Sequence, residues 1–144
     1  AVKDIAMILL IIGGAGALKQ ILVDCGISGQ IAAQLQDMNI HPLMAAWSIA
    51  AIIRVCLGSA TVAGLTAAGI VAPIVATSGA DPNLMVLATG AGSLMFSHVN
   101  DPGFWMYKEY FNISIKDSIK TWSIMETIVS VAGIIFIFIL SYFI

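Results

Sequence analysis

The sequence predicts an all-α integral membrane protein, and three observations support this fold class. First, 60% of the 144 residues are hydrophobic and only 10% are charged, whereas soluble proteins carry about 25% charged residues. Second, the mean hydropathy of +1.00 is too high for a surface in contact with water. Third, the charges separate long apolar stretches, and about 20 apolar residues suffice for a helix to cross a bilayer. The net charge of −2 leaves no basic field for a polyanion, so nucleic-acid binding is excluded.

The first 41 residues are predicted to hold a helix end and an interfacial segment. Residues 5–18 are apolar and end in a glycine cluster, which indicates the end of a transmembrane helix. Residues 19–41 are more polar, with apolar residues at roughly helical spacing, as in amphipathic segments of the membrane interface. The chain begins with alanine and shows no signal-peptide pattern. We therefore expect it to be a fragment of a longer protein.

The stretch 42–80 is predicted to be a re-entrant hairpin. Its only charge is Arg54, and its centre over residues 58–64 reads Gly-Ser-Ala-Thr-Val-Ala-Gly. The run is too long for one span, and its small and hydroxyl residues suit two half-helices that meet at an unwound tip. Non-helical backbone at membrane depth requires protein or a water-filled cavity to satisfy its polar groups. A hairpin here therefore implies a site.

Residues 82–113 are predicted to form a discontinuous transmembrane helix. Asp81 and Pro82 begin it, and the run Ser-His-Val-Asn-Asp-Pro-Gly interrupts it. A polar amphipathic stretch at 114–121, expected in the interface, leads to the final transmembrane helix at 122–144. Lysines gather before that helix, which favours a cytoplasmic position for the residues that precede it.

Two polar breaks in succession are typical of the binding site of a secondary transporter. Half-helix N-termini suit an anionic group, and unwound carbonyls suit a proton carrier or a cation. The polar residues at the breaks are the donors and acceptors that a polyhydroxylated molecule needs: Ser59, Thr61, Ser97, His98, Asn100 and Asp101.

Other chemistries find little support in the sequence. An intramembrane hydrolase lacks the HExxH and GxSxG motifs, so we do not expect an enzyme. Cys25 and Cys56 have no further cysteine or nearby histidine at metal-site spacing, so we expect no metal site.

Several of the polar residues have more than one interpretation. Arg54 either binds a substrate carboxylate or pairs with a protein carboxylate or reaches the interface. His98 either relays protons or fixes the broken backbone. Asp101 either caps the following half-helix or carries the coupled proton. Asp101 is favoured over Glu126 as the proton carrier, and Glu126 is best explained as a carboxylate favoured by the dipole at the start of the last helix. Trp122 is explained as an interface anchor or a packing residue.

Two motifs give the chain a resemblance to a known family. They are GSATVA at 58–63 and FSHVNDPGFW at 96–105, the latter followed by KEYFN at 108–112. Together with IIGGAGALKQ at 11–20, they closely resemble the C-terminal part of the gluconate permease family of proton symporters. The resemblance implies a branch of the ion transporter superfamily built from two inverted repeats. Residues 1–144 are then a partial transport domain that holds the second repeat's half of the site.

The resemblance also implies a function. It is proton-coupled uptake of gluconate or a related sugar acid by a multi-pass carrier of the bacterial cytoplasmic membrane, driven by the proton gradient without a cofactor. The partners are the organic anion, protons and the lipid bilayer, with a homodimer as a further option. Two alternatives stay open: a symporter of D-serine or another small hydroxylated acid, and a structural membrane subunit. The coupled proton is assigned to Asp101, and the substrate to Arg54, Gly58, Ser59, Thr61, Ser97, His98 and Asn100.

Overall fold

The computed structural model describes residues 40–144 and, before them, only residues 17, 21, 24 and 25. The expectations for 5–18 and 19–41 therefore lie almost entirely outside the described residues. The described part is helical and contains no strand. Its elements are α3 (Pro42–Leu57), α4 (Ala60–Ser78), α5 (Pro82–Gly92), α6 (Pro102–Phe111), α7 (Ile115–Ser118), the π turn η1 (Ile119–Ser123) and α8 (Ile124–Leu140).

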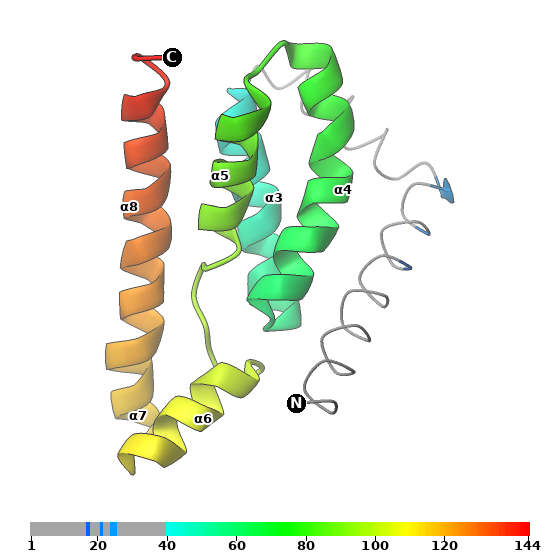
Figure 1. Ribbon diagram of the computed structural model, residues 1–144. Coiled ribbons are helices and arrows are strands. Elements are labelled where there is room, and N and C mark those ends of the chain that lie inside the picture. The colour runs from blue at the N-terminus through cyan, green and yellow to red at the C-terminus, as the bar shows by residue number, and fades with distance from the viewer. Residues whose placement is uncertain (1–16, 18–20, 22–23, 26–39) are drawn as a thin grey trace, which may run out of the picture.

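The helices form a small bundle in which α5 is the central element. α3 and α4 make an antiparallel helical hairpin, and α5 packs against both (Figure 1). α8 lies along α5 on the side away from α4 (Figure 1). The chain between α5 and α6 is non-helical, and α6 and α7 lie at the end of the bundle where α8 begins (Figure 1).

Local capping signals fix the ends of the hairpin and the start of α5. The side chains of Ser59 and Asp81 accept hydrogen bonds at the N-termini of α4 and α5, and Pro82 takes the first position of α5. α3 and α4 end at Gly58 and Gly79, whose φ angles of +71° and +67° lie in the left-handed region. Such signals are short-range, so the sequence alone can place them.

The hairpin differs from the sequence expectation at its tip. Only Gly58 and Ser59 are non-helical, because α4 already begins at Ala60. α4 is also a full 19 residues long with a mean hydropathy of 1.8, so it is long and apolar enough to cross a membrane by itself. The re-entrant path of 42–80 stays a prediction.

The last three elements join into one long apolar helix. α7, η1 and α8 continue from Ile115 to Leu140, 26 residues with a mean hydropathy of 2.3. From the sequence, the final helix is expected to begin at residue 122, after an interfacial segment at 114–121. In the structure the π turn connects these two parts without a break.

Much of this long helix is apolar and not covered by the rest of the described chain. Large side chains such as Ile128 and Phe136 are exposed on α8, at 61% and 68% of their full surface. A contiguous apolar face of this kind needs lipid or further protein against it. With α4, it gives the described residues two helices suited to a membrane.

A core of small and aliphatic side chains holds the bundle together. It draws on α3, α4, α5 and α8, and its buried members are Leu43, Ala46, Val71, Ile74, Leu84, Met85, Ala88, Ile134 and Ile137. A close approach between α3 and α5 occurs at Gly92, where an added Cβ would lie 2.3 Å from the carbonyl oxygen of Trp47. Small residues allow such contacts between membrane helices.

This contact predicts different outcomes for two glycines of α5. Gly92→Ala should destabilise the protein by about 1–3 kcal/mol, because the new methyl group meets the α3 backbone. Gly90→Ala should leave stability unchanged or raise it by up to about 1 kcal/mol, because no atom lies within 4 Å of its added Cβ. Thermal unfolding of the complete protein in detergent measures both. Equal melting temperatures for the two variants would contradict the close α3–α5 contact.

Candidate functional site

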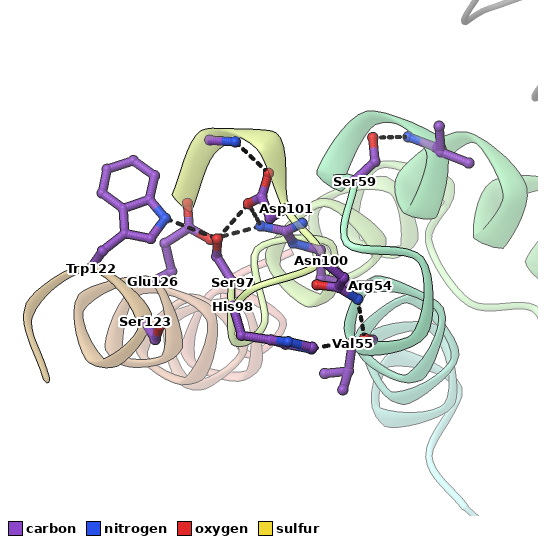
Figure 2. Close-up of polar contacts among 12 residues, drawn as sticks. Arg54, Val55, Ser59, Ser97, His98, Asn100, Asp101, Trp122, Ser123 and Glu126 are labelled. Carbon is purple, nitrogen blue, oxygen red and sulfur yellow. Dashed lines mark hydrogen bonds and ion pairs between the residues drawn. The ribbon is translucent and has the colours of Figure 1, made fainter. Parts of the chain in front are cut away.

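A buried guanidinium stands at the centre of the candidate site. Arg54 lies in the last turn of α3 and is only 2% exposed. Its Nη2 atom donates to Asp101 Oδ2 at 2.6 Å and to Glu126 Oε2 at 3.0 Å (Figure 2). One cation therefore joins two carboxylates that come from the start of α6 and from α8.

Asp101 is held by several donors. Besides Arg54, its Oδ2 atom accepts the hydroxyl hydrogen of Ser97, and its Oδ1 atom accepts the backbone N–H of Gly103 at 2.8 Å. The last bond makes Asp101 the N-cap of α6, where the helix dipole also favours a negative charge. The capping interpretation of Asp101 is thus observed, together with an ion pair.

The long C-terminal helix contributes a second contact to the same cluster. Trp122 Nε1 donates to Ser97 Oγ at 2.9 Å, and Ser97 is completely buried. Trp122 belongs to the π turn η1, a distortion that often occurs at functional sites. Trp122 and Glu126 are four residues apart on one helix and meet the cluster together (Figure 2).

The broken segment also closes over the tip of the hairpin. Asn100 Nδ2 donates to the carbonyl oxygens of Val55 at 2.8 Å and Cys56 at 3.3 Å. His98 Nε2 lies 3.1 Å from the same Val55 oxygen, and since a carbonyl only accepts, this nitrogen carries the hydrogen in that contact. These bonds satisfy carbonyls that the end of α3 would otherwise leave free (Figure 2).

Gly58 permits this contact between the tip and the break. Its left-handed backbone ends α3, and an added Cβ would lie 2.3 Å from the carbonyl oxygen of Asn100. A side chain at this position would therefore push the hairpin tip away from the broken segment.

The charges of the cluster do not balance. One guanidinium faces two carboxylates, so with all three groups ionised the cluster carries one excess negative charge. Not all donors of the guanidinium are hydrogen-bonded, because its buried Nε and Nη1 atoms have no hydrogen-bond partner among the described residues. Buried N–H groups aimed at no acceptor suit an anion that arrives from outside this part of the chain.

The structure brings some of the predicted residues together and leaves others apart. Arg54, Ser97 and Asp101 meet directly. Ser59 caps α4 through a 3.4 Å bond from the Val62 N–H, and Thr61 is exposed in the first turn of α4. Their roles toward a substrate stay predictions.

Two residues of the cluster are not recognised as such from sequence. The sequence explains Glu126 by a helix dipole and Trp122 by the interface or by packing, yet both bond to the buried cluster around Arg54. The available signal is that Glu126 is the only charge in 122–144. An isolated carboxylate in an apolar helix needs a partner.

Two other features of the described chain offer no alternative site for a hydroxylated acid. Within residues 40–144 and the few described before them, no group of three or more His, Cys, Asp or Glu side chains could hold a metal ion. A groove of about 490 Å³ lies between α4 and α5, but it is lined by Leu65, Val71, Met85 and similar side chains. It offers almost no hydrogen-bonding groups for a hydroxylated acid.

The cluster predicts a large loss of stability when its cation is removed. Arg54→Met should destabilise the protein by about 3–5 kcal/mol, because two carboxylates are left without a counter-charge. Lys108→Met, which removes a cation from the pair with the exposed Glu109, should cost only about 0–1 kcal/mol. Thermal unfolding in detergent compares the two. The triple variant Arg54→Met, Asp101→Asn, Glu126→Gln should recover much of the loss; no recovery would argue against an electrostatic origin.

Comparison with known proteins places the sequence in a family. The family described as GntP family permease matches residues 1–143. A high-affinity gluconate transporter of Escherichia coli (strain K12) is 60% identical over 135 residues, which cover 94% of this chain and 31% of that protein. A Gnt-II system L-idonate transporter of the same organism is 50% identical with the same coverage. A gluconate permease of Bacillus subtilis (strain 168) is 52% identical over 141 residues, covering 98% of this chain and 32% of that protein. No solved structure matches the chain.

These matches identify the family of the chain. The chain spans about a third of the length of the curated relatives it matches. The relatives are named as permeases and transporters rather than enzymes, in line with the apolar helices of the structure. The resemblance carried by the motifs at 58–63 and 96–105 is confirmed, and the chain belongs to the GntP family of permeases.

Proposed function

We propose that the protein containing this chain takes up gluconate or a related sugar acid together with protons across the bacterial cytoplasmic membrane. The observation that carries the proposal is the buried Arg54, whose Nε and Nη1 atoms lack an acceptor in the described chain. A carboxylate is the natural partner of a guanidinium edge, because two parallel hydrogen bonds can form at once.

The two breaks supply the remaining groups that a sugar acid needs. Ser59 and Thr61 lie where α4 begins, and His98 and Asn100 lie in the segment between α5 and α6. Hydroxyl, imidazole and amide groups can replace water around the hydroxyls of the substrate. In this proposal the carboxylate binds at Arg54 and the hydroxylated tail lies toward the tip of the hairpin.

Access to Arg54 requires a movement, because the residue is buried and the nearby hairpin tip at Gly58 lies closely against Asn100. We propose that the tip and the broken segment separate to admit the substrate and close over it. The loaded bundle then moves against the rest of the protein to expose the site on the other side, as in alternating access.

The proton is placed on the carboxylates that share Arg54. The sequence favours Asp101 as its carrier, and in the structure Asp101 and Glu126 both pair with Arg54. Two carboxylates on one guanidinium leave a negative charge that a proton can neutralise. Protonation and binding of an organic anion are then linked by charge.

The relatives narrow the substrate class to be tested. Their names mention gluconate and L-idonate, which are both polyhydroxylated carboxylic acids. D-serine or another small hydroxylated acid is the alternative within the family, and a structural subunit is the alternative outside it. An electrically unbalanced buried cluster is costly and has no purpose in a purely structural subunit, which favours transport.

Uptake by the complete protein tests this proposal. In proteoliposomes with an alkaline interior, labelled gluconate should accumulate, and collapse of the pH gradient should release it. Unlabelled L-idonate should compete, whereas D-serine should not. Competition by D-serine alone would favour the alternative substrate, and the absence of both uptake and exchange would favour a structural role.

A hydroxyl deletion tests the proposed substrate contact at the tip. Thr61→Val should raise the apparent KM for gluconate several-fold at normal membrane abundance, because one hydrogen bond to a substrate hydroxyl is lost. Thr77→Val, at the opposite end of the same helix, is the matched control and should leave KM unchanged. An unchanged KM for Thr61→Val would remove this residue from the site.

A further inference from the structure

The two carboxylates that share Arg54 are stabilised very unequally. We propose that Glu126, rather than Asp101, takes up the coupled proton, and that its protonation frees Arg54 to bind the carboxylate of the substrate. This inference rests on the proposed function and revises the assignment of the proton to Asp101. Glu126, which the sequence explains only by a helix dipole, is then the group that couples protons to transport.

Asp101 is built to remain ionised. Its two oxygens accept from three donors: Arg54 Nη2, the Ser97 hydroxyl and the Gly103 N–H. The indole N–H of Trp122 can only donate, so Ser97 accepts from it and directs its own hydrogen to Asp101. A proton on Asp101 would have to displace one of these donors or weaken the cap of α6.

Glu126 has much less support for a negative charge. Within the described residues its side chain accepts one hydrogen bond, from Arg54 Nη2 to Oε2. The dipole does not help it, because the helix begins at Ile115 and continues through the π turn, so Glu126 is three turns from the true N-terminus. The effect of the dipole fades beyond the first turn.

The surroundings of Glu126 leave Arg54 as its main electrostatic partner. The elements packed against α8 are α5, α3 and η1. From these and from the start of α6, the charged groups that face Glu126 in the described chain are Arg54 and Asp101. One attracts the ionised form of Glu126 and the other repels it, and Asp101 already holds the same guanidinium nitrogen at a shorter distance.

The charge count then links the proton to the substrate. With Glu126 ionised, the cluster of one cation and two anions carries a charge of −1. An incoming carboxylate would make this charge −2. A proton that attaches to a Glu126 oxygen breaks the ion pair with Nη2 and brings the cluster to zero. The substrate carboxylate can then occupy the free edge of the guanidinium, which includes the unpartnered Nη1, and the charge returns to −1. Proton and anion thus enter together, one of each.

The test compares neutral variants of the two carboxylates in the complete protein, reconstituted in proteoliposomes with labelled gluconate as the probe. Glu126→Gln mimics the protonated form, so accumulation driven by a pH gradient should fall to the level of protein-free vesicles. Exchange of gluconate across the membrane should persist in this variant and become independent of pH. Asp101→Asn should still accumulate gluconate in response to the gradient, at a reduced level, because Asn can cap α6 and Glu126 still titrates.

Two further variants serve as controls. Glu109→Gln removes an exposed carboxylate outside the cluster and should behave as the unchanged protein. Glu126→Asp keeps a titratable group and should retain gradient-driven accumulation with an altered pH dependence, which separates loss of the proton from loss of the fold.

The outcomes separate this inference from the function on which it rests. If the unchanged protein neither accumulates nor exchanges gluconate, the proposed function fails. If it transports gluconate with protons and Glu126→Gln still accumulates it on a pH gradient, the inference is overturned and the function stands. The inference is equally overturned if Asp101→Asn, and not Glu126→Gln, removes the response to the gradient.

Discussion

The structure depends on one buried guanidinium. Arg54 reaches from the end of α3 to carboxylates on α6 and α8, which are far apart in the sequence. Taking these charges out of water costs several kcal/mol per ion, and a cation of suitable geometry must offset that cost. The three elements are therefore held in one arrangement, because any displacement of one of them leaves a buried charge without its partner.

The same interaction explains how non-helical backbone can exist between apolar helices. The segment between α5 and α6 is fixed at its middle by Ser97, which bonds to Trp122, and at its end by Asp101, which pairs with Arg54. Beside Asp101, Asn100 bonds to carbonyls in the last turn of α3. The broken segment thus satisfies carbonyls at the end of α3 that would otherwise be free, as a low-dielectric environment requires. Movement of one break must then disturb the other, a property that suits a binding site which has to open and close.

Sequence reasoning locates the features that depend on neighbouring residues. The Asp-Pro start of α5 and the capping interpretation of Asp101 at α6 are short-range signals of this kind, whereas the unwound tip expected over 58–64 is limited to Gly58 and Ser59. It also identifies Arg54 and Asp101, because charges inside apolar stretches are rare, although it leaves their pairing open. The sequence explains Glu126 by the dipole at a helix N-terminus, but this explanation requires the helix to begin near residue 122. In the structure the helix begins at Ile115, so Glu126 is too far from the N-terminus for the dipole to stabilise its charge. The sequence around Trp122 does not reveal that a π turn extends the helix back to Ile115.

The two carboxylates accept different numbers of hydrogen bonds, which suits them to different roles in the site. A carboxylate that caps a helix and accepts three hydrogen bonds is suited to hold the cation in place throughout the cycle. A carboxylate that accepts only one hydrogen bond, from that cation, can be protonated and separate from the cation without breaking other described contacts. Arg54 is then always paired, with Asp101 as its permanent partner and either Glu126 or the substrate as its second. An empty and protonated site would leave the buried guanidinium with still more unused donors, which disfavours release of the anion without the proton. Coupling of the two follows from the cost of burying an unmatched charge.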